Sequence, residues 1–178
     1  MGSLKKINLF EMKNLVFTVD YSLPIDHFLL QKNPIGGCCK SKNIDAHFDN
    51  FPVPPDFVGK KMKVTGDLFG VDYPQHTIFD KEASEDLKNL HYGTVSLIEL
   101  LAFFSEFSPQ ITQLVRQQSR HISIAATRNA WRSKSSPYFY HFPEIRTDYS
   151  LESYVLDLKG TSFLFGQYIL GIYERQLL

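Results

Sequence analysis

The chain has 178 residues, of which 43% are apolar and 21% charged, and 19 basic residues balance 19 acidic ones. This composition excludes disordered and fibrous chains and argues against a strongly basic nucleic-acid-binding class. Aromatic residues make up 14% of the chain, so we expect a core rich in rings. The length suits one compact domain, and residues 1–178 are taken as such.

Cysteine usage and hydropathy bear on the compartment. Cys38 and Cys39 are adjacent, and neighbouring Cα atoms lie about 3.8 Å apart, whereas disulfides need roughly 4.4–6.8 Å. Lys5 and Lys6 interrupt any secretory leader. The longest lightly charged apolar run, Ser162 to Tyr173, is far shorter than the ~20 residues that cross a bilayer. We expect a cytoplasmic protein without a membrane partner.

The N-terminal third predicts strands around a loop region. Leu15 to Tyr21 is β-branched and aromatic, which favours a strand. Residues 22–60 are rich in Pro and Gly and are expected to be ordered by packing of Phe48, Phe51 and Phe57. Lys61 to Tyr73 alternates, which predicts either a strand pair or one strand bent at Gly66 and Gly70.

The middle of the chain predicts helices. Asp80 to Leu90 has an N-cap and acids in its first turns. Ser96 and Glu99 have capping-box spacing before a helical apolar repeat, formed by Leu97, Leu100, Leu101, Phe104 and Phe107. Ser108 and Pro109 predict the end of that helix and the start of another, which runs to Ser119.

The C-terminal third predicts strands again, at His121–Thr127, Tyr138–Phe142, Leu151–Leu158 and Phe163–Tyr173. A helix competes for the last segment but is weakened by Gly166 and Gly171. Strands, then helices, then strands predict an α+β domain. Its sheet is expected to be mostly antiparallel, with two or three central helices (about 80–119) packed on one side.

Charge is segregated along this neutral chain. Residues 107–143 contain no Asp or Glu and five cations, whereas residues 67–106 hold eight acids against two lysines. Such a pattern concerns partners rather than fold. One interpretation is that the acidic helices neutralise the basic block within the molecule, and another is that the block binds a partner.

A partner-binding surface is suggested by cations interleaved with rings: Arg116, Arg120, Arg128, Trp131, Arg132, Lys134, Tyr138 and Tyr140. Arginine and aromatic residues together are typical of binding hot spots. Rings with guanidinium groups also serve single-stranded nucleic acid. The neutral isoelectric point and the lack of a nucleic-acid motif favour a protein or another anionic partner instead.

A second pattern offers nucleophilic chemistry. Cys38 or Cys39 could supply a thiolate, with His47 as base and Asp49 orienting the imidazole. The same residue types could ligate a metal, but adjacent cysteines do not easily share one tetrahedral ion. Inert buried thiols are the simpler interpretation. The remaining histidines fit no ligand motif, and no phosphate or dinucleotide motif occurs.

The sequence therefore predicts a non-enzymatic interaction domain that binds a protein or other anionic partner and needs no cofactor or metal. A thiol-dependent enzyme is the alternative.

Overall fold

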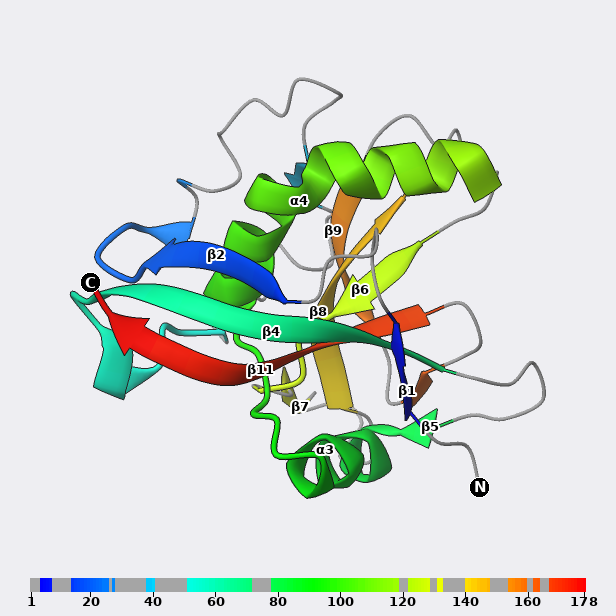
Figure 1. Cartoon of the computed structure of the whole chain (residues 1–178), viewed down its shortest axis with the longest axis horizontal. Helices are drawn as coiled ribbons and strands as arrows, with labels where there is room; N and C mark the ends of the chain where they lie inside the picture. Colours follow the sequence, from blue (N-terminus) through cyan, green and yellow to red (C-terminus); the bar gives the residue numbers. More distant parts are fainter. Residues whose placement is uncertain are drawn as a thin grey trace.

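A computed structural model describes residues 4–7, 14–25, 27, 38–40, 51–71, 78–118, 122–128, 131–132, 140–147, 154–159, 162–163 and 167–178. They form a mixed α+β structure (Figure 1). The helices are α3 (Asp80–Asn89), α4 (Leu97–Gln118) and the short 3-10 helix η3 (Pro55–Phe57). The strands are β1 (Leu4–Ile7), β2 (Leu15–Asp20), β3 (Cys38–Lys40), β4 (Lys61–Val71), β5 (Ile78–Phe79), β6 (Ser123–Ala125), β7 (Trp131–Arg132), β8 (Tyr140–Thr147), β9 (Tyr154–Lys159), β10 (Ser162–Phe163) and β11 (Gln167–Leu177).

Nine strands form one sheet in the order β1-β4-β11-β6-β8-β9-β3, with β2 also paired to β4 and β7 to β8. β4 and β11 are its longest strands and run antiparallel, from Tyr168 opposite Gly70 to Leu177 opposite Met62. Two strand pairs, β11 with β6 and β3 with β9, are parallel, and the other described pairs are antiparallel. The predicted mostly antiparallel sheet is confirmed, and it curls into a half-barrel (Figure 1).

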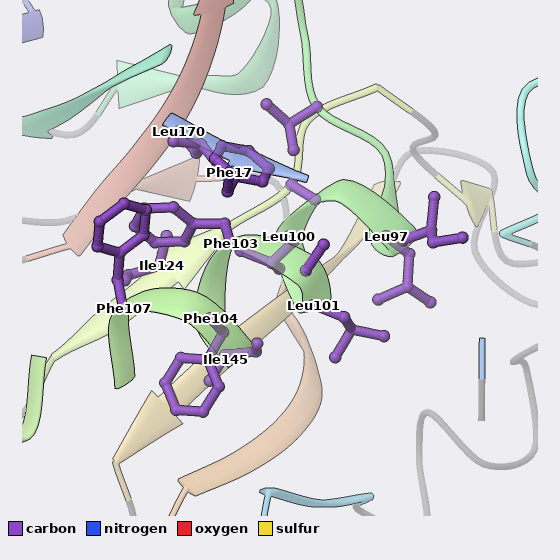
Figure 2. Close-up of a cluster of buried hydrophobic side chains, with 14 of the residues drawn as sticks. Phe17, Leu97, Leu100, Leu101, Phe103, Phe104, Phe107, Ile124, Ile145 and Leu170 are labelled. Atoms are coloured by element: carbon purple, nitrogen blue, oxygen red, sulfur yellow. The ribbon is translucent and has the colours of Figure 1, made fainter. Parts of the chain in front are cut away.

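The larger core lies between the sheet and α4. Apolar residues on one side of α4 recur at helical spacing, so they point together toward β2, β6, β8 and β11 (Figure 2). Phe103 lies edge-on to Phe17 of β2 at 5.7 Å between ring centroids, and Phe107 lies 5.1 Å from Phe103. Phe104 meets Tyr154 of β9 at 4.6 Å. The predicted ring-rich core is present in this region.

α4 is one helix, so the predicted break at Ser108 and Pro109 is wrong. Pro109 lies inside the helix, although its ring lacks the N–H that would bond the carbonyl of residue 105. Apolar residues on both sides of the proline, Phe107 and Ile111, are buried in the same core, and this packing holds the two halves together. The helix changes direction along its length (Figure 1), as proline-containing helices do.

α3 covers the opposite face of the sheet, which corrects the prediction that the helices pack on one side. Ala83 and Leu87, four residues apart on α3, are fully buried against Phe69 of β4 and Ile169 of β11. Neighbouring residues along those strands, such as Leu68, belong to the α4 core instead. Side chains of a strand alternate between faces, so the two central strands are buried on both sides and require a helix on each.

α3 ends in a Schellman motif. The amide of Tyr92 donates to the carbonyl of Leu87 at 2.8 Å, and that of His91 donates to Lys88 at 2.9 Å. His91 occupies the left-handed position, with φ of 63°, where glycine is the usual residue. Tyr92 then packs on the cluster that contains Leu87, so the turn directs the chain back across the sheet toward α4.

The close pairing of β4 with β11 requires glycine at position 66. A methyl carbon there would lie 2.4 Å from the backbone oxygen of Gly171. The register also shifts just beyond this point, between Ile172 and Glu174. The two central strands are therefore locally closer than side chains allow, and the predicted irregularity at Gly66 occurs within a single strand rather than a strand pair.

Other predicted segments are confirmed with shifted ends. β2, α3, β6, β8 and β9 fall within or beside the segments predicted for them. β11 is a strand, so the competing C-terminal helix is wrong. In the loop region, Phe51 is buried and Phe57 packs on the core, as expected, whereas Phe48 lies outside the described residues. None of the helices in the described ranges is long and apolar enough to cross a membrane.

Candidate functional site

The thiol-dependent site is only partly within the described residues. Cys38 and Cys39 lie in β3, an edge strand paired with β9 so that Cys38 is opposite Tyr154 and Cys39 opposite Val155. His47 and Asp49 lie outside the described residues. Among the residues whose positions are described, no group of three or more His, Cys, Asp and Glu side chains could hold a metal ion.

Two arginines of the basic block, Arg116 and Arg128, lie near opposite ends of α4. Arg116 is exposed in the last turn of the helix, whereas the amide of Arg128 donates to the carbonyl of Val95, two residues before the helix begins. Twenty-two residues of straight helix span about 33 Å, and although the bend shortens this distance, the two arginines lie at different places on the molecule.

The other predicted binding residues are placed in part. Trp131 and Arg132 form β7 and pair with β8, which brings Arg132 opposite Tyr140. The backbone register therefore joins two of the predicted residues. Arg120, Lys134 and Tyr138 lie outside the described residues.

Arg128 belongs to a compact cluster built on Phe57, which we call the Phe57 cluster (Phe57, Arg128 and Arg175). The guanidinium carbon of Arg128 lies 5.3 Å from the centre of the Phe57 ring, and that of Arg175 lies 5.4 Å from it. Tyr21 adds a second ring, 5.2 Å from Phe57 between centroids. The two guanidinium-to-ring distances are within the range of cation–π attraction.

Three segments that are far apart in the sequence position this cluster. Phe57 ends η3, where its amide donates to the carbonyl of Pro54 at 2.9 Å, and prolines at 54 and 55 fix the turn. Arg128 follows β6 and is held through its amide by Val95 at 2.8 Å. Arg175 lies on β11 opposite Val64, on the side of the sheet that faces α4.

Arg175 is paired with a buried carboxylate. Its Nε donates to Oε1 of Glu99 at 2.8 Å, and its Nη2 donates to the carbonyl of Thr94 at 3.1 Å. The Glu99 side chain is fully buried and also accepts from the Tyr21 hydroxyl at 2.7 Å and from the Ser96 amide and hydroxyl at 2.8 Å. One half of the predicted capping box of α4 is thus present, the bond from the Ser96 amide to Glu99, and this glutamate also anchors β11.

Ionisation of this group is set by the pairing. Burial by itself raises the pKa of Glu99, but the hydrogen bond and charge of Arg175 outweigh it and hold that pKa below its usual value. Burial tends to lower the pKa of Arg175, whereas the hydrogen bond and charge of Glu99 raise it above its usual value. Burial and the charge of Glu99 both raise the pKa of Tyr21. Glu99 and Arg175 are therefore charged and Tyr21 neutral near pH 7.

Arg128 differs from Arg175 in its surroundings. It is half-buried on the ring, and no carboxylate in the described part of the chain forms an ion pair with it. Asp56, the acidic residue of η3, is exposed. Since Glu99 neutralises Arg175, Arg128 is the positive charge of the Phe57 cluster that no carboxylate of the described residues compensates.

These contacts bear on the idea that the acidic segment neutralises the basic block. Glu99 is bound to Arg175, which lies outside the basic block, and Asp67 accepts a hydrogen bond from Tyr92. Neither Arg116 nor Arg128 pairs with a carboxylate among the described side chains. Neutralisation of these two cations is therefore not seen within the described residues, and Asp72 of the acidic segment lies outside them.

Sequence reasoning found Arg128 but missed the rest of the cluster. Phe57 packs on the core, as predicted. Because it lies at the edge of the core, its ring also contacts two arginines. Glu99 was identified as a helix cap alone. Arg175 has no local signal, because only the β4–β11 register brings it beside residues from the first half of the chain.

A second polar cluster lies on the other face of the sheet. Glu144 of β8 is directly opposite Asp157 of β9, and like charges so placed repel. Arg146 lies 3.0 Å from Asp157 and 4.0 Å from Glu144, and the Ser123 hydroxyl donates to Glu144. The two acids thus have partners within the cluster, which we interpret as structural.

Comparison with protein-family models, characterised proteins and solved structures finds no match for this chain.

Proposed function

We propose that this protein is a binding domain for an anionic protein partner, and that the Phe57 cluster is the centre of its binding surface. The observation that carries the proposal is Arg128, a half-buried guanidinium held against an aromatic ring with no carboxylate from the described residues beside it. An arginine on a ring at the edge of a core is typical hot-spot material. A carboxylate of the partner would pair with Arg128 as Glu99 pairs with Arg175.

The environment of Arg128 favours such a partner. Partial burial lowers the effective dielectric constant, so a charge-assisted hydrogen bond formed there is stronger than one in open water. The ring holds one side of the guanidinium in place before a partner arrives, which reduces the entropy lost on binding.

The buried ionisable groups support binding rather than catalysis. Glu99 accepts four hydrogen bonds and has a lowered pKa, so it is held ionised and has no proton to exchange near neutral pH. A carboxylate in this state stabilises the fold and fixes Arg175. The Phe57 cluster is therefore proposed as a recognition site.

Retention on immobilised polyglutamate over a salt series tests this function. We expect Arg128→Glu to elute at lower salt than the wild type, because it reverses the one uncompensated charge of the cluster. Arg116→Glu is the matched control, since it makes the same charge change at the exposed far end of α4. Circular dichroism confirms that both variants fold.

The control also separates two versions of the proposal. Equal retention of Arg128→Glu and the wild type overturns the proposed function. Equal weakening by both substitutions assigns the binding to general charge and removes the Phe57 cluster from its centre.

A further inference from the structure

The Phe57 cluster also indicates which kind of anion it accepts. Resting on the proposed function, we infer that the ligand is an acidic peptide segment that presents both carboxylate and branched aliphatic side chains on one face. Phosphorylated peptides and nucleic acids are the competing ligands.

The charge of the cluster matches one carboxylate. Arg175 is already neutralised by Glu99, and its Nε and one Nη are bound to Glu99 and Thr94. The remaining full charge is that of Arg128 alone. A phosphate group carries close to two negative charges at neutral pH, whereas a guanidinium and a carboxylate balance and match in a bidentate pair.

Exposed apolar side chains border the cluster. Val58, next to Phe57, is 61% exposed, and Leu177, two residues beyond Arg175 and therefore on the same side of β11, is 68% exposed. The backbone joins these two segments, because the amide of Leu178 donates to the carbonyl of Lys61 at 2.9 Å. Val58 and Leu177, two of the exposed large apolar residues in the described part, thus lie beside the cluster.

This combination defines a ligand with two chemistries. A carboxylate on Arg128 satisfies the charge, and aliphatic groups cover Val58 and Leu177, which otherwise contact water. Nucleic acids offer repeated phosphates and flat bases instead, and they are bound by rows of cations with accessible rings. Phe57 is only partly accessible because it packs on the core and carries two arginines.

Fluorescence anisotropy with three labelled peptides of about ten residues tests the inference. The first peptide repeats Glu-Glu-Leu-Leu, so that each face of the extended chain carries both kinds of side chain. The second repeats Glu-Glu-Ser-Ser, and the third repeats Gln-Gln-Leu-Leu. We expect the first to bind at least about tenfold more tightly than either of the others, a factor that corresponds to about 1.4 kcal/mol. A phosphoserine peptide and oligo-dT serve as the competing anions.

Two variants connect the effect to the cluster. Arg128→Gln is expected to weaken the Glu/Leu peptide about tenfold or more, and Val58→Ser is expected to weaken the Glu/Leu peptide without changing the Glu/Ser peptide. Val16→Ser is a matched control for Val58→Ser, because Val16 is also exposed but lies on the outer side of β2.

The outcomes separate this inference from the proposed function. Equal binding of the Glu/Leu and Glu/Ser peptides, with both dependent on Arg128, overturns the inference and leaves the proposed function standing. Tighter binding of the phosphoserine peptide or oligo-dT through Arg128 also overturns the inference. Binding that is unchanged in Arg128→Gln, or no binding of any probe, overturns both.

Discussion

Replacing Arg175 with methionine is expected to cost about 3 kcal/mol of the free energy of unfolding at pH 7. The substitution leaves the fully buried Glu99 carboxylate without its counter-charge, and removing one partner of a buried ion pair costs roughly 3–5 kcal/mol. The lower end of this range applies for two reasons. Glu99 keeps three neutral donors, from Tyr21 and Ser96, and the Arg175 side chain is itself 19% exposed.

The direction in which pH changes the cost of Arg175→Met follows from the pKa of Glu99. The pKa of Glu99 is lowered in the folded protein, so its stabilising effect is present above the unfolded pKa of about 4.5 and is lost as the pH falls through the lower folded value. Without Arg175 the burial of Glu99 is offset only by the hydrogen bonds from Ser96 and Tyr21, and its pKa rises. The carboxyl group of the variant then takes up a proton on acidification, and the cost of the substitution becomes smaller at about pH 4 than at pH 7.

Urea unfolding of a double-mutant cycle measures the effect. The cycle contains Arg175→Met, Glu99→Gln and the double variant, with Arg116→Met as a surface control expected to change stability by less than about 0.5 kcal/mol. We expect the double variant to lose at least about 1 kcal/mol less than the sum of the single variants. Strict additivity, or an Arg175→Met cost equal to that of the control, would refute the assigned pairing.

Three other predictions concern stability. Gly66→Ala is expected to lose about 3 kcal/mol or to fail to fold, because the added carbon would lie 2.4 Å from the Gly171 oxygen; an unchanged urea midpoint contradicts this close approach. His91→Gly is expected to gain about 1 kcal/mol, since φ at His91 is 63°; a melting temperature at or below that of the wild type counts against the strain. Tyr21→Phe is expected to flatten the loss of stability in alkali. Burial and the charge of Glu99 raise the pKa of Tyr21 above 10.0 in the folded protein. The Tyr21 phenol therefore ionises at lower pH in the unfolded chain, so its contribution to stability is complete below about pH 10 and decreases above that pH. Unfolding free energies between about pH 9 and pH 11 check this, and parallel curves for the two proteins rule it out.

Local patterns predicted the elements because local physics produces them. The spacing of Leu97, Leu100, Leu101 and Phe104 follows the helical repeat, and these residues are buried on one side of α4. The predicted helix break at Pro109 is wrong because long-range packing outweighs the local preference. Proline disfavours a helix interior locally, but buried residues before and after it belong to one core, and tertiary packing prevailed.

Long-range pairing decided what the sequence pattern could not. The face that α3 covers depends on which strands lie at the centre of the sheet, and these are β4 and β11, which are about 100 residues apart. The same pairing brings Arg175 to Glu99 and Phe57. Arg128 was predicted as a binding residue from the composition of residues 107–143, whereas its ring partner came from a segment that was interpreted as packing alone.

The central pairing of β4 with β11 also has a consequence for the order of folding. Both faces of β4 bear large apolar residues, Leu68 and Phe69 among them, and they gain their main neighbour only after residues 167–177 have been synthesised. Closing a loop of about 100 residues is slow and entropically costly. Until then β4 can pair only with β1 and β2, so its other edge stays open in the nascent chain, and an open edge of an apolar strand is a surface of the kind that chaperones bind. Stopped-flow refolding is expected to show formation of this pair as the slow step, and a fast single phase would show that it forms early.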